Sequence, residues 1–559
     1  MSTKKNQSEQ QTGADIVVKT LEQHDVKWVF GVPGAKIDKV FNTLVDSSIQ
    51  TVVCRHEQSA AFIAGGIGRM TGKAGVAIAT SGPGISNLVT GLATANTEGD
   101  PVVALGGAVA LSDRLKKIHQ TMDSVSLCRP VSKYSVEVDS PESVSEVMTN
   151  AFRSAESDRP GAAFVSLPMD IMVAPSKCEV LTPPAYSGAG PADTTAIKEA
   201  ARLINQAKRP VVLLGLLASK PQNAAAIQEL IQSGKLPVVG TFQAAGAVSA
   251  NLFSNFGGRV GQINNQPADE ILAAGDLVIT IGYDPVEYWP SIWNKGNKRP
   301  IVHLDALPTD IDNSYNPAVE LIGDIAATVR LLTPQVSHAA PEPSMLRLLE
   351  KISASREELA RLSAALNGTP VHPLRLVAEL QKILTLDTTL CLDMGSFHLW
   401  MARHLYSFRA RQILISNGQQ TLGVALPWAI AATLVRPAEK VLSISGDGGF
   451  LFSAMELETA VRLQSNLVHM IWIDGTYDMV AVQEKHKYGR SSGTKFGPVD
   501  PVKYAEAFGA RGFMIQSPDQ ITSVLKQAFD TPGPVLIGVH VDYRDNHKLF
   551  EEVDEWSIH

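Results

Sequence analysis

Short runs of apolar, mostly β-branched residues recur along the chain, and each ends in Gly, Asp or Pro before a stretch with helical spacing. A continuous apolar run predicts a strand that is buried on both faces, as in a parallel sheet covered by helices. The runs form three sets, at 28–32, 51–54, 75–80, 101–107 and 162–168, then at 210–215, 237–241, 277–282, 300–305 and 318–323, and last at 388–393, 412–416, 440–449, 467–475 and 534–542. This pattern predicts an α/β fold with three tandem doubly wound parallel-sheet domains.

Two segments interrupt the alternation of strand and helix, at 174–195 and at 333–343. Both are rich in Pro, Gly, Ser or Thr, which is typical of linkers. We therefore expect three domains of similar size. Their expected boundaries are 13–178 for the N-terminal domain, 191–335 for the central domain and 365–548 for the C-terminal domain, with a helix at 345–366 leading into the last.

The composition narrows the class of protein. The 559 residues carry 49 Lys and Arg against 56 Asp and Glu, a net charge of −7, with no run of basic residues. We therefore expect no nucleic-acid partner. The four cysteines, Cys54, Cys128, Cys178 and Cys391, include no closely spaced pair. Their spacing argues against a disulfide scaffold or a zinc ribbon and suits a reducing compartment.

Targeting and membrane segments are not evident. The first dozen residues lack the apolar core of a signal peptide. The longest apolar stretches, 211–218 and 425–435, are well short of the ~20 residues that a helix needs to cross a bilayer. We expect a cytoplasmic protein with no membrane partner.

Candidate chemistry lies at the ends of two strands in the third set. One run ends in Gly446-Asp447-Gly448-Gly449, and the next ends in Asp474-Gly475-Thr476. Doubly wound folds bind ligands at the carboxyl ends of their strands, and glycines let backbone N–H groups approach an anion. The sequence Ser453-Ala454-Met455-Glu456 has the form of a capping box, so we expect a helix to begin there.

Two carboxylates with carbonyl oxygens nearby form a hard-oxygen site, which favours Mg²⁺ or Ca²⁺ over zinc. A diphosphate that Mg²⁺ bridges to the chain would use all of these features. Gly-Asp-Gly by itself is more often a tight turn after a strand. The second acid at the end of the following strand is what favours a binding site over a turn.

Gly-Asp-Gly with a second oxygen ligand at this interval resembles the signature of thiamine-diphosphate-dependent enzymes, and the resemblance covers nearly the full chain. In that family a glutamate of the first domain contacts the aminopyrimidine ring of the cofactor. Glu57 matches it, because it follows the strand TVVC (51–54) and leads a helix of small residues, and Ser-Gly-Pro-Gly at 81–84 strengthens the match. The resemblance implies that Glu57 is catalytic and shares a proton with the pyrimidine N1′ atom.

Within this superfamily the chain is most similar to the acetolactate synthases. The stretch LDMGSFHLW (392–400) resembles the family segment that contacts the diphosphate. This implies that Ser396 and the Phe397 backbone bind the cofactor, with Met394 as an apolar wall of the same pocket.

A second stretch, SNGQQTLGVALPWAI (416–430), resembles the glycine-rich segment of the family. It implies that Leu422 is the hydrophobic pillar that wedges the two cofactor rings into a V. It also implies that Gln420 offers its backbone carbonyl to the 4′-amino group. Without the motif, Leu422 would be interpreted as an ordinary core residue.

The resemblance assigns the remaining site residues as well. The implied metal ligands are Asp447, Asp474 and the carbonyl oxygen of Thr476. The other implied cofactor contacts are Gly448, Gly449 and Tyr477. The implied substrate contacts are Met479 and Gln483, on a helix with the two side chains four residues apart. Gln120, which follows His119, is the second implied catalytic residue and reaches the reacting centre.

Departures from the biosynthetic enzymes of the family concern specificity and FAD. Gln483 stands where those enzymes have a tryptophan, GYDPVEYWP (282–290) replaces their arginine-and-aspartate segment, and Met169 replaces a lysine. Asp474 replaces the commoner Asn but keeps an oxygen ligand. These changes favour the catabolic, pyruvate-only enzyme, and we do not expect FAD.

The resemblance therefore implies a transferase that decarboxylates pyruvate and condenses it with a second pyruvate to give 2-acetolactate and CO₂, on the way to acetoin and butanediol. It implies thiamine diphosphate and Mg²⁺ as cofactors. Because Glu57 and the metal ligands lie in different domains, it also implies a homodimer or a dimer of dimers with active sites between subunits.

Three alternatives remain open. Another thiamine-diphosphate 2-oxoacid decarboxylase or a pyruvate oxidase would be revealed by an acetaldehyde product or by flavin absorbance. A nucleotide-binding regulatory module built on Rossmann-like domains would gain no activity from Mg²⁺ and thiamine diphosphate. A catalytically dead homologue is disfavoured because Glu57, Asp447 and Asp474 are all present.

Overall fold

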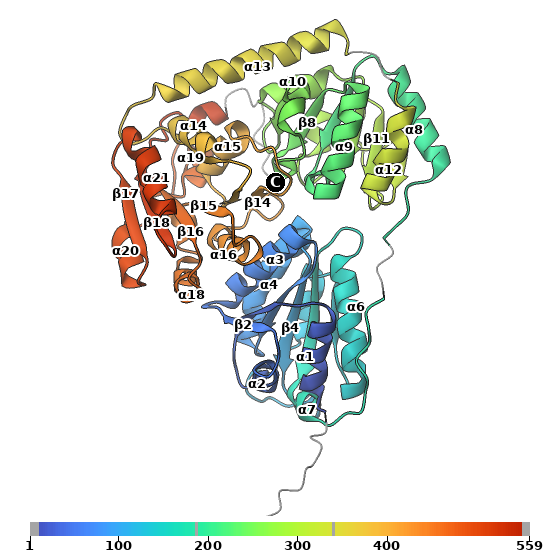
Figure 1. Ribbon diagram of the computed structural model, residues 1–559, viewed down its shortest axis with the longest axis vertical. Coiled ribbons are helices and arrows are strands. Elements are labelled where there is room, and N and C mark those ends of the chain that lie inside the picture. The colour runs from blue at the N-terminus through green and yellow to red at the C-terminus, as the bar shows by residue number, and fades with distance from the viewer. Residues whose placement is uncertain (1–10, 185–187, 338–340, 551–559) are drawn as a thin grey trace, which may run out of the picture. The chain divides into compact units, whose positions relative to one another are not determined.

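The computed structural model describes residues 11–184, 188–337 and 341–550, and it contains three six-stranded sheets (Figure 1). Neighbouring strands are parallel in all three sheets. The prediction of three doubly wound parallel α/β sheets is therefore confirmed. Within the described residues, no helix is both long and apolar enough to cross a bilayer. The expected linkers fall in part on residues 185–187 and 338–340, and the expected absence of a signal peptide on residues 1–10, outside the described residues.

The first sheet has the strand order β2-β1-β3-β4-β6-β5. Its strands are β1 (Trp28–Val32), β2 (Gln50–Val53), β3 (Gly75–Ala79), β4 (Val102–Ala108), β5 (Tyr134–Glu137) and β6 (Ala162–Pro168). The helices around it are α1 (Gly13–Gln23), α2 (Asp38–Leu44), α3 (Glu57–Thr71), α4 (Pro83–Glu98), α5 (Ser124–Cys128), α6 (Val144–Glu156) and α7 (Met169–Val173). Apolar side chains of α1 and α6 form one core cluster with the strands.

The central sheet has the order β12-β11-β10-β7-β8-β9, which is the order of dinucleotide-binding folds when numbered from β7. Its strands are β7 (Pro210–Leu214), β8 (Val238–Thr241), β9 (Phe256–Val260), β10 (Leu277–Ile281), β11 (Ile301–Asp305) and β12 (Val319–Ile322). Its helices are α8 (Thr194–Gln206), α9 (Pro221–Gly234), α10 (Pro267–Ala274), α11 (Pro290–Trp293) and α12 (Ile325–Leu332). Val212 and Val211 belong to different core clusters, so both faces of β7 are covered, which explains its continuous apolar run.

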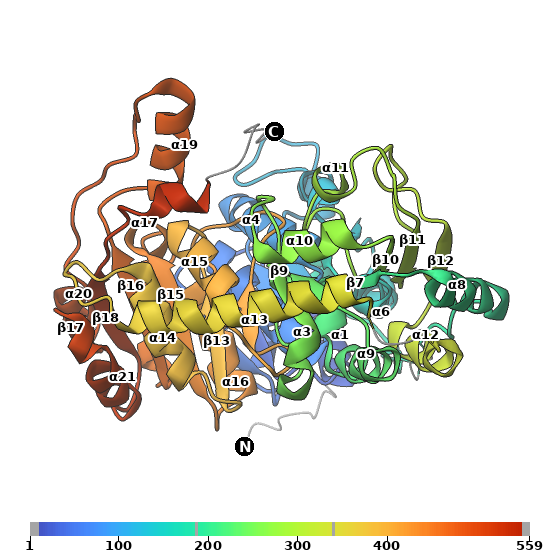
Figure 2. The same cartoon turned by 90° about the horizontal axis from the view of Figure 1, so that it is seen from above.

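The third sheet has the order β14-β13-β15-β16-β18-β17, which repeats the order of the first sheet. Its strands are β13 (Thr388–Leu392), β14 (Ile413–Ile415), β15 (Lys440–Gly446), β16 (Leu467–Ile473), β17 (Arg511–Ile515) and β18 (Val535–His540). The helices of this part are α14 (Pro373–Ile383), α15 (Ser396–His404), α16 (Ala425–Val435), α17 (Asp447–Phe450), α18 (Leu457–Arg462), α19 (Asp478–Tyr488), α20 (Pro501–Ala507) and α21 (Ile521–Phe529). The long helix α13 (Pro343–Ala364) lies across α10 and α14, as Figure 2 shows.

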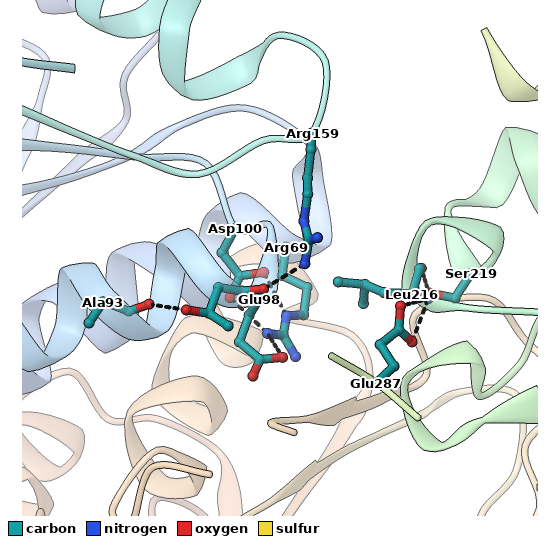
Figure 3. A network of polar contacts seen from close by, with 9 residues as sticks. Arg69, Ala93, Glu98, Asp100, Arg159, Leu216, Ser219 and Glu287 are labelled. Atoms are coloured by element: carbon teal, nitrogen blue, oxygen red, sulfur yellow. Dashed lines mark hydrogen bonds and ion pairs between the residues drawn. The ribbon is translucent and has the colours of Figure 1, made fainter. Parts of the chain in front are cut away.

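The chain forms two compact units that are not contiguous in sequence. The first unit contains residues 1–186 with the segments 426–437 and 453–465, and the second unit contains the rest, including the central and third sheets. Within the first unit, Arg69 of α3 pairs with Asp100 at 2.7 Å (Figure 3). The Arg69 guanidinium also lies 4.4 Å from the ring centroid of Trp428. A Cβ atom at Gly66 would lie 2.8 Å from the Cβ of Ala431, so the glycine allows α3 and α16 to pack closely.

Each sheet contains one strand that the apolar pattern does not predict, namely β5, β9 and β17. All three lie at an edge of their sheet. The sequences of the three strands are YSVE, FGGRV and RGFMI, which interrupt apolar residues with charges, Ser or Gly. β5 and β17 are only partly buried and need no continuous apolar run, whereas β9 is buried but carries two glycines and Arg259, so all three give a weak sequence signal.

Candidate active site

The candidate site lies where the chain order of the third sheet reverses, at the carboxyl ends of the neighbouring strands β13 and β15. From β13 the chain continues to β14 on one side, and from β15 it continues to β16 on the other. The loops that follow two such strands diverge and leave a crevice, where open α/β sheets bind their ligands. The crevice in this sheet lies between residues 393–397 and residues 446–449.

A cavity of about 640 Å³ occupies this crevice in the second unit. Its volume is within the range of roughly 300–1,000 Å³ that is usual for small-molecule sites. Every site residue that the sequence predicts in the C-terminal domain lines this one cavity, namely Met394, Ser396, Phe397, Gln420, Leu422, Asp447, Gly448, Gly449, Asp474, Thr476, Tyr477, Met479 and Gln483. Residues of the central domain complete the wall, among them Ile263, Val286 and Trp289.

The loop after β15 and the loop after β16 are joined by the carboxylate of Asp447. Its Oδ2 accepts the N–H of Gly475 at 2.8 Å and that of Asp474 at 3.3 Å, and its Oδ1 accepts the N–H of Gly448 at 3.0 Å. The Thr476 hydroxyl donates to Asp474 Oδ2 at 2.7 Å, which orients the second carboxylate. Both acids are therefore held in place by the chain itself.

Without a bound cation, ionising the two partly buried carboxylates is energetically unfavourable. Burial raises the pKa of Asp447. Burial, together with the nearby charge of Asp447, raises the pKa of Asp474 to about 7. A divalent cation between the two carboxylates would remove this cost, because it stabilises the ionised form of both.

The donor set fits Mg²⁺ bound together with a phosphorylated ligand. Among the described residues, no cluster of three or more His, Cys, Asp or Glu side chains could by itself hold a metal ion. Mg²⁺ is usually bound through one or two carboxylates plus ligand phosphates and waters, so two acids and the carbonyl of Thr476 are a sufficient protein contribution. The site therefore fits a metal–diphosphate pair better than a metal alone.

Two features beside the acids suit a diphosphate. A Cβ atom at Gly448 would lie 2.7 Å from the Tyr477 ring, so a side chain there would displace that ring, and Gly448 lines the cavity with its backbone alone. Ser396 is the first residue of α15, where the partial positive charge of a helix N-terminus favours an anion. The Ser396 hydroxyl donates to Asp478 at 2.5 Å, and this bond fixes its position.

Leu422 is not an ordinary core residue, because it is only half buried and lines the cavity. It lies between Gln420, whose φ is +50°, and Gly423, whose φ is +86°. These two left-handed residues turn the backbone so that the leucine is presented at the end of a loop. This placement is compatible with the pillar role that the sequence suggests.

Asp393 is a site residue that the sequence analysis overlooks. It is buried and accepts the N–H of Met394 at 2.8 Å and that of Gly423 at 2.9 Å. Burial raises its pKa to about 7, against the effect of these bonds and of further backbone bonds from Val424 and Ala425. The signal was present, because Asp393 is an acid at the end of a parallel strand, as Asp447 and Asp474 are.

The two predicted catalytic residues of the N-terminal domain, Glu57 and Gln120, lie in the first unit. Both contact the segment that contains Ser-Gly-Pro-Gly and the start of α4. Asn87 donates to Glu57 Oε2 at 2.9 Å, and Ser81 donates to Gln120 Oε1 at 3.1 Å. Glu57 is the first residue of α3 and is 8% exposed, so its carboxylate is largely shielded from water.

The expected capping box at 453–456 is wrong. Ser453 makes no side-chain cap, and a short 3-10 helix (Ala454–Glu456) precedes α18. The Glu456 carboxylate instead accepts the N–H groups of Arg55 and His56, both at 3.0 Å. These tertiary partners are 401 and 400 residues away in sequence, so local spacing could not reveal them.

The helix α19 carries both predicted substrate residues. Met479 and Gln483 are half buried, and both line the cavity. The sequence analysis did not identify Tyr543, which also lines the cavity and is half buried near the acids. Asn546 donates to Asp478, so the segment near the C-terminus holds the start of α19 in place.

Comparison with known proteins identifies the family. Three family models match, described as "Thiamine pyrophosphate enzyme, N-terminal TPP binding domain" over residues 11–127, "central domain" over 197–332 and "C-terminal TPP binding domain" over 393–539. The chain is 53% identical over 544 residues to "Acetolactate synthase, catabolic" of Raoultella terrigena, with 97% of each chain covered.

Two further relatives extend the comparison. The chain is 48% identical over 537 residues to "Acetolactate synthase" of Bacillus subtilis (strain 168), covering 96% of this chain and 94% of that one. It is 31% identical over 559 residues to "Probable acetolactate synthase large subunit" of Methanococcus aeolicus, covering 95% and 92%. The chain therefore belongs to the thiamine pyrophosphate enzyme family, and within it to the acetolactate synthases.

Proposed function

We propose that this protein is a catabolic acetolactate synthase that joins two molecules of pyruvate into 2-acetolactate with release of CO₂. The observation that carries the proposal is the cavity at the β13–β15 crevice, which two buried acids, a glycine-rich loop and an apolar wall line together. The full-length similarity to relatives of this name supports the same conclusion.

Thiamine diphosphate, when bound, supplies a carbon nucleophile for the 2-oxo carbon of pyruvate and accepts the electron pair that decarboxylation releases. The chain's own residues bind and orient it. Ser396 and the N-terminus of α15 would bind the diphosphate, and Asp447, Asp474 and the Thr476 carbonyl would hold Mg²⁺ against it. Gly448 and Gly449 would bring their backbone close to the same phosphate oxygens.

Orientation and proton transfer fall to other residues. Glu57 would hold a proton at the pyrimidine N1′ atom, and the backbone carbonyl of Gln420 would hold the 4′-amino group. Leu422 would keep the two rings at the angle that brings the amino group to the reacting carbon. Gln120 would contact the reacting centre. We propose these roles on the positions of the residues and on the family resemblance.

The pocket must also exclude water, because a proton delivered from solvent would divert the reaction to acetaldehyde. Met394, Leu422 and Met479 give the cavity apolar walls on the side of the third sheet. Val286 and Trp289 do the same on the side of the central sheet. Met479 and Gln483 would contact the second pyruvate.

We further propose that the enzyme works without FAD. A dinucleotide would bind at the reversal point of the central sheet, between β7 and β10. There, the Glu287 carboxylate accepts the N–H of Leu216 with both oxygens, at 3.0 and 2.9 Å (Figure 3). It also accepts the Thr241 hydroxyl at 2.6 Å. A buried carboxylate of the chain thus occupies the place that a phosphate would take.

Aromatic side chains fill the space beside this carboxylate. Tyr283, Trp293 and Tyr315 are buried and pack with their ring centroids 5.8 to 6.2 Å apart. A Cβ atom at Gly215 would lie 2.3 Å from the Cα of Tyr283, so the loop after β7 is closed against the loop after β10. The residues present do not fit a flavin dinucleotide at this place.

We propose a homodimer or a dimer of dimers as the working form, with Glu57 of one subunit serving the diphosphate site of another. A cytoplasmic location is proposed from the sequence pattern. We also propose 13–178, 191–335 and 365–548 as the limits of the three domains, each of which contains one sheet.

The test is an assay with pyruvate, Mg²⁺ and thiamine diphosphate and with no added flavin, followed by product analysis. We expect 2-acetolactate and CO₂, and a purified protein without flavin absorbance. Acetaldehyde as the main product would favour a 2-oxoacid decarboxylase instead. Flavin absorbance together with oxygen consumption would favour a pyruvate oxidase.

A further inference from the structure

The connection between β2 and α3 places Glu57, and it lies where the backbone has left the sheet. The last rung of the β2–β1 ladder is the bond from Cys54 N–H to Gly31 O at 2.9 Å. The helix α3 then begins at Glu57, with His56 as its N-cap in an extended conformation. The N–H groups of Arg55 and His56 therefore belong neither to the sheet nor to the helix.

A single carboxylate oxygen satisfies both N–H groups. Glu456 Oε1 accepts from Arg55 and from His56, each at 3.0 Å. Its Oε2 accepts the Thr459 hydroxyl at 2.6 Å. Glu456 is fully buried, and Thr459 is buried as well, so water cannot replace these bonds. All of these residues belong to the first unit.

A second contact from the same segment reinforces this one. The Arg462 guanidinium donates to the carbonyl oxygen of Val53. Glu456 and Arg462 therefore hold the backbone on both sides of Cys54. The side chain of Glu57 has its own partner, Asn87, at 2.9 Å. The peptide before Glu57 and the carboxylate of Glu57 are thus held independently.

We propose that Glu456 is a positioning residue, which fixes the peptide groups before Glu57 and so sets the place of the Glu57 carboxylate for its proton transfer. The inference rests on the proposed role of Glu57. An acid–base group acts only within hydrogen-bond reach of its proton, and a misplacement of about 1 Å costs on the order of 100-fold in rate. Glu456 touches no reacting atom, so its effect must pass through Glu57.

Three variants test whether Glu456 acts by positioning the backbone before Glu57. Glu456→Ala removes the acceptor of both N–H groups, and we expect kcat per cofactor site to fall by about 10- to 100-fold, with thiamine diphosphate affinity within threefold. Glu456→Gln keeps an acceptor oxygen and should stay within about threefold of the wild type. Glu22→Gln is the control, because it removes a charge from the exposed side of α1 in the same unit, away from Glu456 and Arg462. It should leave kcat unchanged.

A double-mutant cycle with Glu57→Gln tests the route of the effect. If Glu456 acts through Glu57, Glu456→Ala should cost less than threefold in the Glu57→Gln background. A merely structural role would lower the melting temperature and the number of cofactor sites but leave kcat per site unchanged. Equal losses of kcat in both backgrounds, or kcat per site within threefold of the wild type in Glu456→Ala, would overturn the proposal.

Hydrogen–deuterium exchange of the protein without cofactor gives a readout that needs no activity. The peptide that contains Arg55 and His56 should be protected in the wild type, in Glu456→Gln and in Glu22→Gln, and should exchange at least tenfold faster in Glu456→Ala. Unchanged protection of this peptide in Glu456→Ala would overturn the proposal, whereas a wild type that forms no acetolactate would contradict only the proposed function. If Glu456→Ala does not fold, Glu456→Asp, which draws the oxygen back by one methylene, takes its place in both experiments with the same expected direction.

Discussion

Both carboxylate oxygens of Asp393 lie 2.9 Å from the backbone nitrogen of Gly423. Asp393 follows the strand β13, and Gly423 follows directly after Leu422. The carboxylate therefore holds the loop that presents the leucine to the cavity. A buried acid in the third sheet thus performs for Leu422 the kind of positioning that we propose Glu456 performs for Glu57.

Removing this carboxylate should loosen the loop. In Asp393→Ala the buried N–H of Gly423 loses its acceptor, which costs about 1–3 kcal/mol of stability. We expect a lower midpoint of urea unfolding and at least a tenfold weaker affinity for thiamine diphosphate. Asp387→Ala, at the exposed beginning of the same strand, is the control and should change neither. Wild-type affinity in Asp393→Ala would show that the loop holds its shape unaided.

Glu57→Gln should lose at least ~100-fold in kcat, the usual scale for a positioned acid–base group. The amide keeps the size of the side chain and its contact with Asn87 but cannot exchange a proton with the pyrimidine. Steady-state kinetics measure the loss, and calorimetry checks that thiamine diphosphate still binds. Near-full turnover in this variant would remove Glu57 from the mechanism.

Asp447→Ala should abolish Mg²⁺-dependent binding of thiamine diphosphate. The change removes one hard-oxygen ligand and also the acceptor of the Gly475 N–H, so the two loops lose both the metal and their direct bond. Calorimetric titration with and without Mg²⁺ measures the effect. The assignment fails if the variant still binds thiamine diphosphate more tightly with Mg²⁺ than without it.

The raised pKa of Asp474 predicts that the stability of the protein without cofactor depends on pH. Burial and the charge of Asp447 raise its pKa to about 7, from 3.8 in the unfolded chain. The folded state binds this proton more tightly, so stability falls as pH rises from about 4 to about 7 and stays low above it. Asp474→Asn removes this loss, because an amide does not ionise.

The measurement is the melting temperature of wild type and Asp474→Asn between pH 5 and pH 8. Without ligands, the variant should gain most over the wild type at pH 8 and least at pH 5. With Mg²⁺ and thiamine diphosphate the gain should shrink, since the cation stabilises the ionised acid. A gain that is independent of pH would mean that Asp474 does not titrate in this range.

We expect the residue at position 483 to determine which 2-oxoacid is accepted as the second substrate. A tryptophan in this place would favour an acceptor with one more methylene, which is worth ~1–3 kcal/mol or roughly 10- to 200-fold. With glutamine we expect pyruvate to be accepted at least as readily as 2-oxobutyrate, and Gln483→Trp should shift the ratio toward 2-oxobutyrate. Competition between the two acids, with both acetohydroxyacids counted, decides it. A strong wild-type preference for acetohydroxybutyrate would contradict the catabolic assignment.

The sequence predicts the interior of this fold better than its margins. Strands that are buried on both faces, such as β7 and β15, need continuous apolar runs and are found from them. The edge strands β5, β9 and β17 lack such a run and are missed. Helix α13 differs by two residues at each end from its expected limits, 345–366.

The residues of the site also divide into those that the sequence predicts and those that it misses. Acids at strand ends reveal Asp447 and Asp474, because strand order brings residues of that kind to one edge of the sheet. Asp393 carries the same signal and lies in the stretch 392–400, but the resemblance assigns the role of that stretch to Ser396 and Phe397, so Asp393 passes unnoticed. Glu456 and Glu287 act on partners that only the tertiary fold brings near, and a local interpretation assigns Glu456 a cap that it does not form.

The discontinuous first unit has a consequence for biosynthesis. Residues 1–186 leave the ribosome well before the segments 426–437 and 453–465, which complete the unit. At about 5–20 residues per second, the interval is on the order of 15–60 seconds. Until then the backbone before Glu57 lacks Glu456, and α3 lacks its neighbour α16. The nascent N-terminal part therefore spends that time as an unfinished structure, and a stalled or truncated chain should be a client of chaperones and proteases.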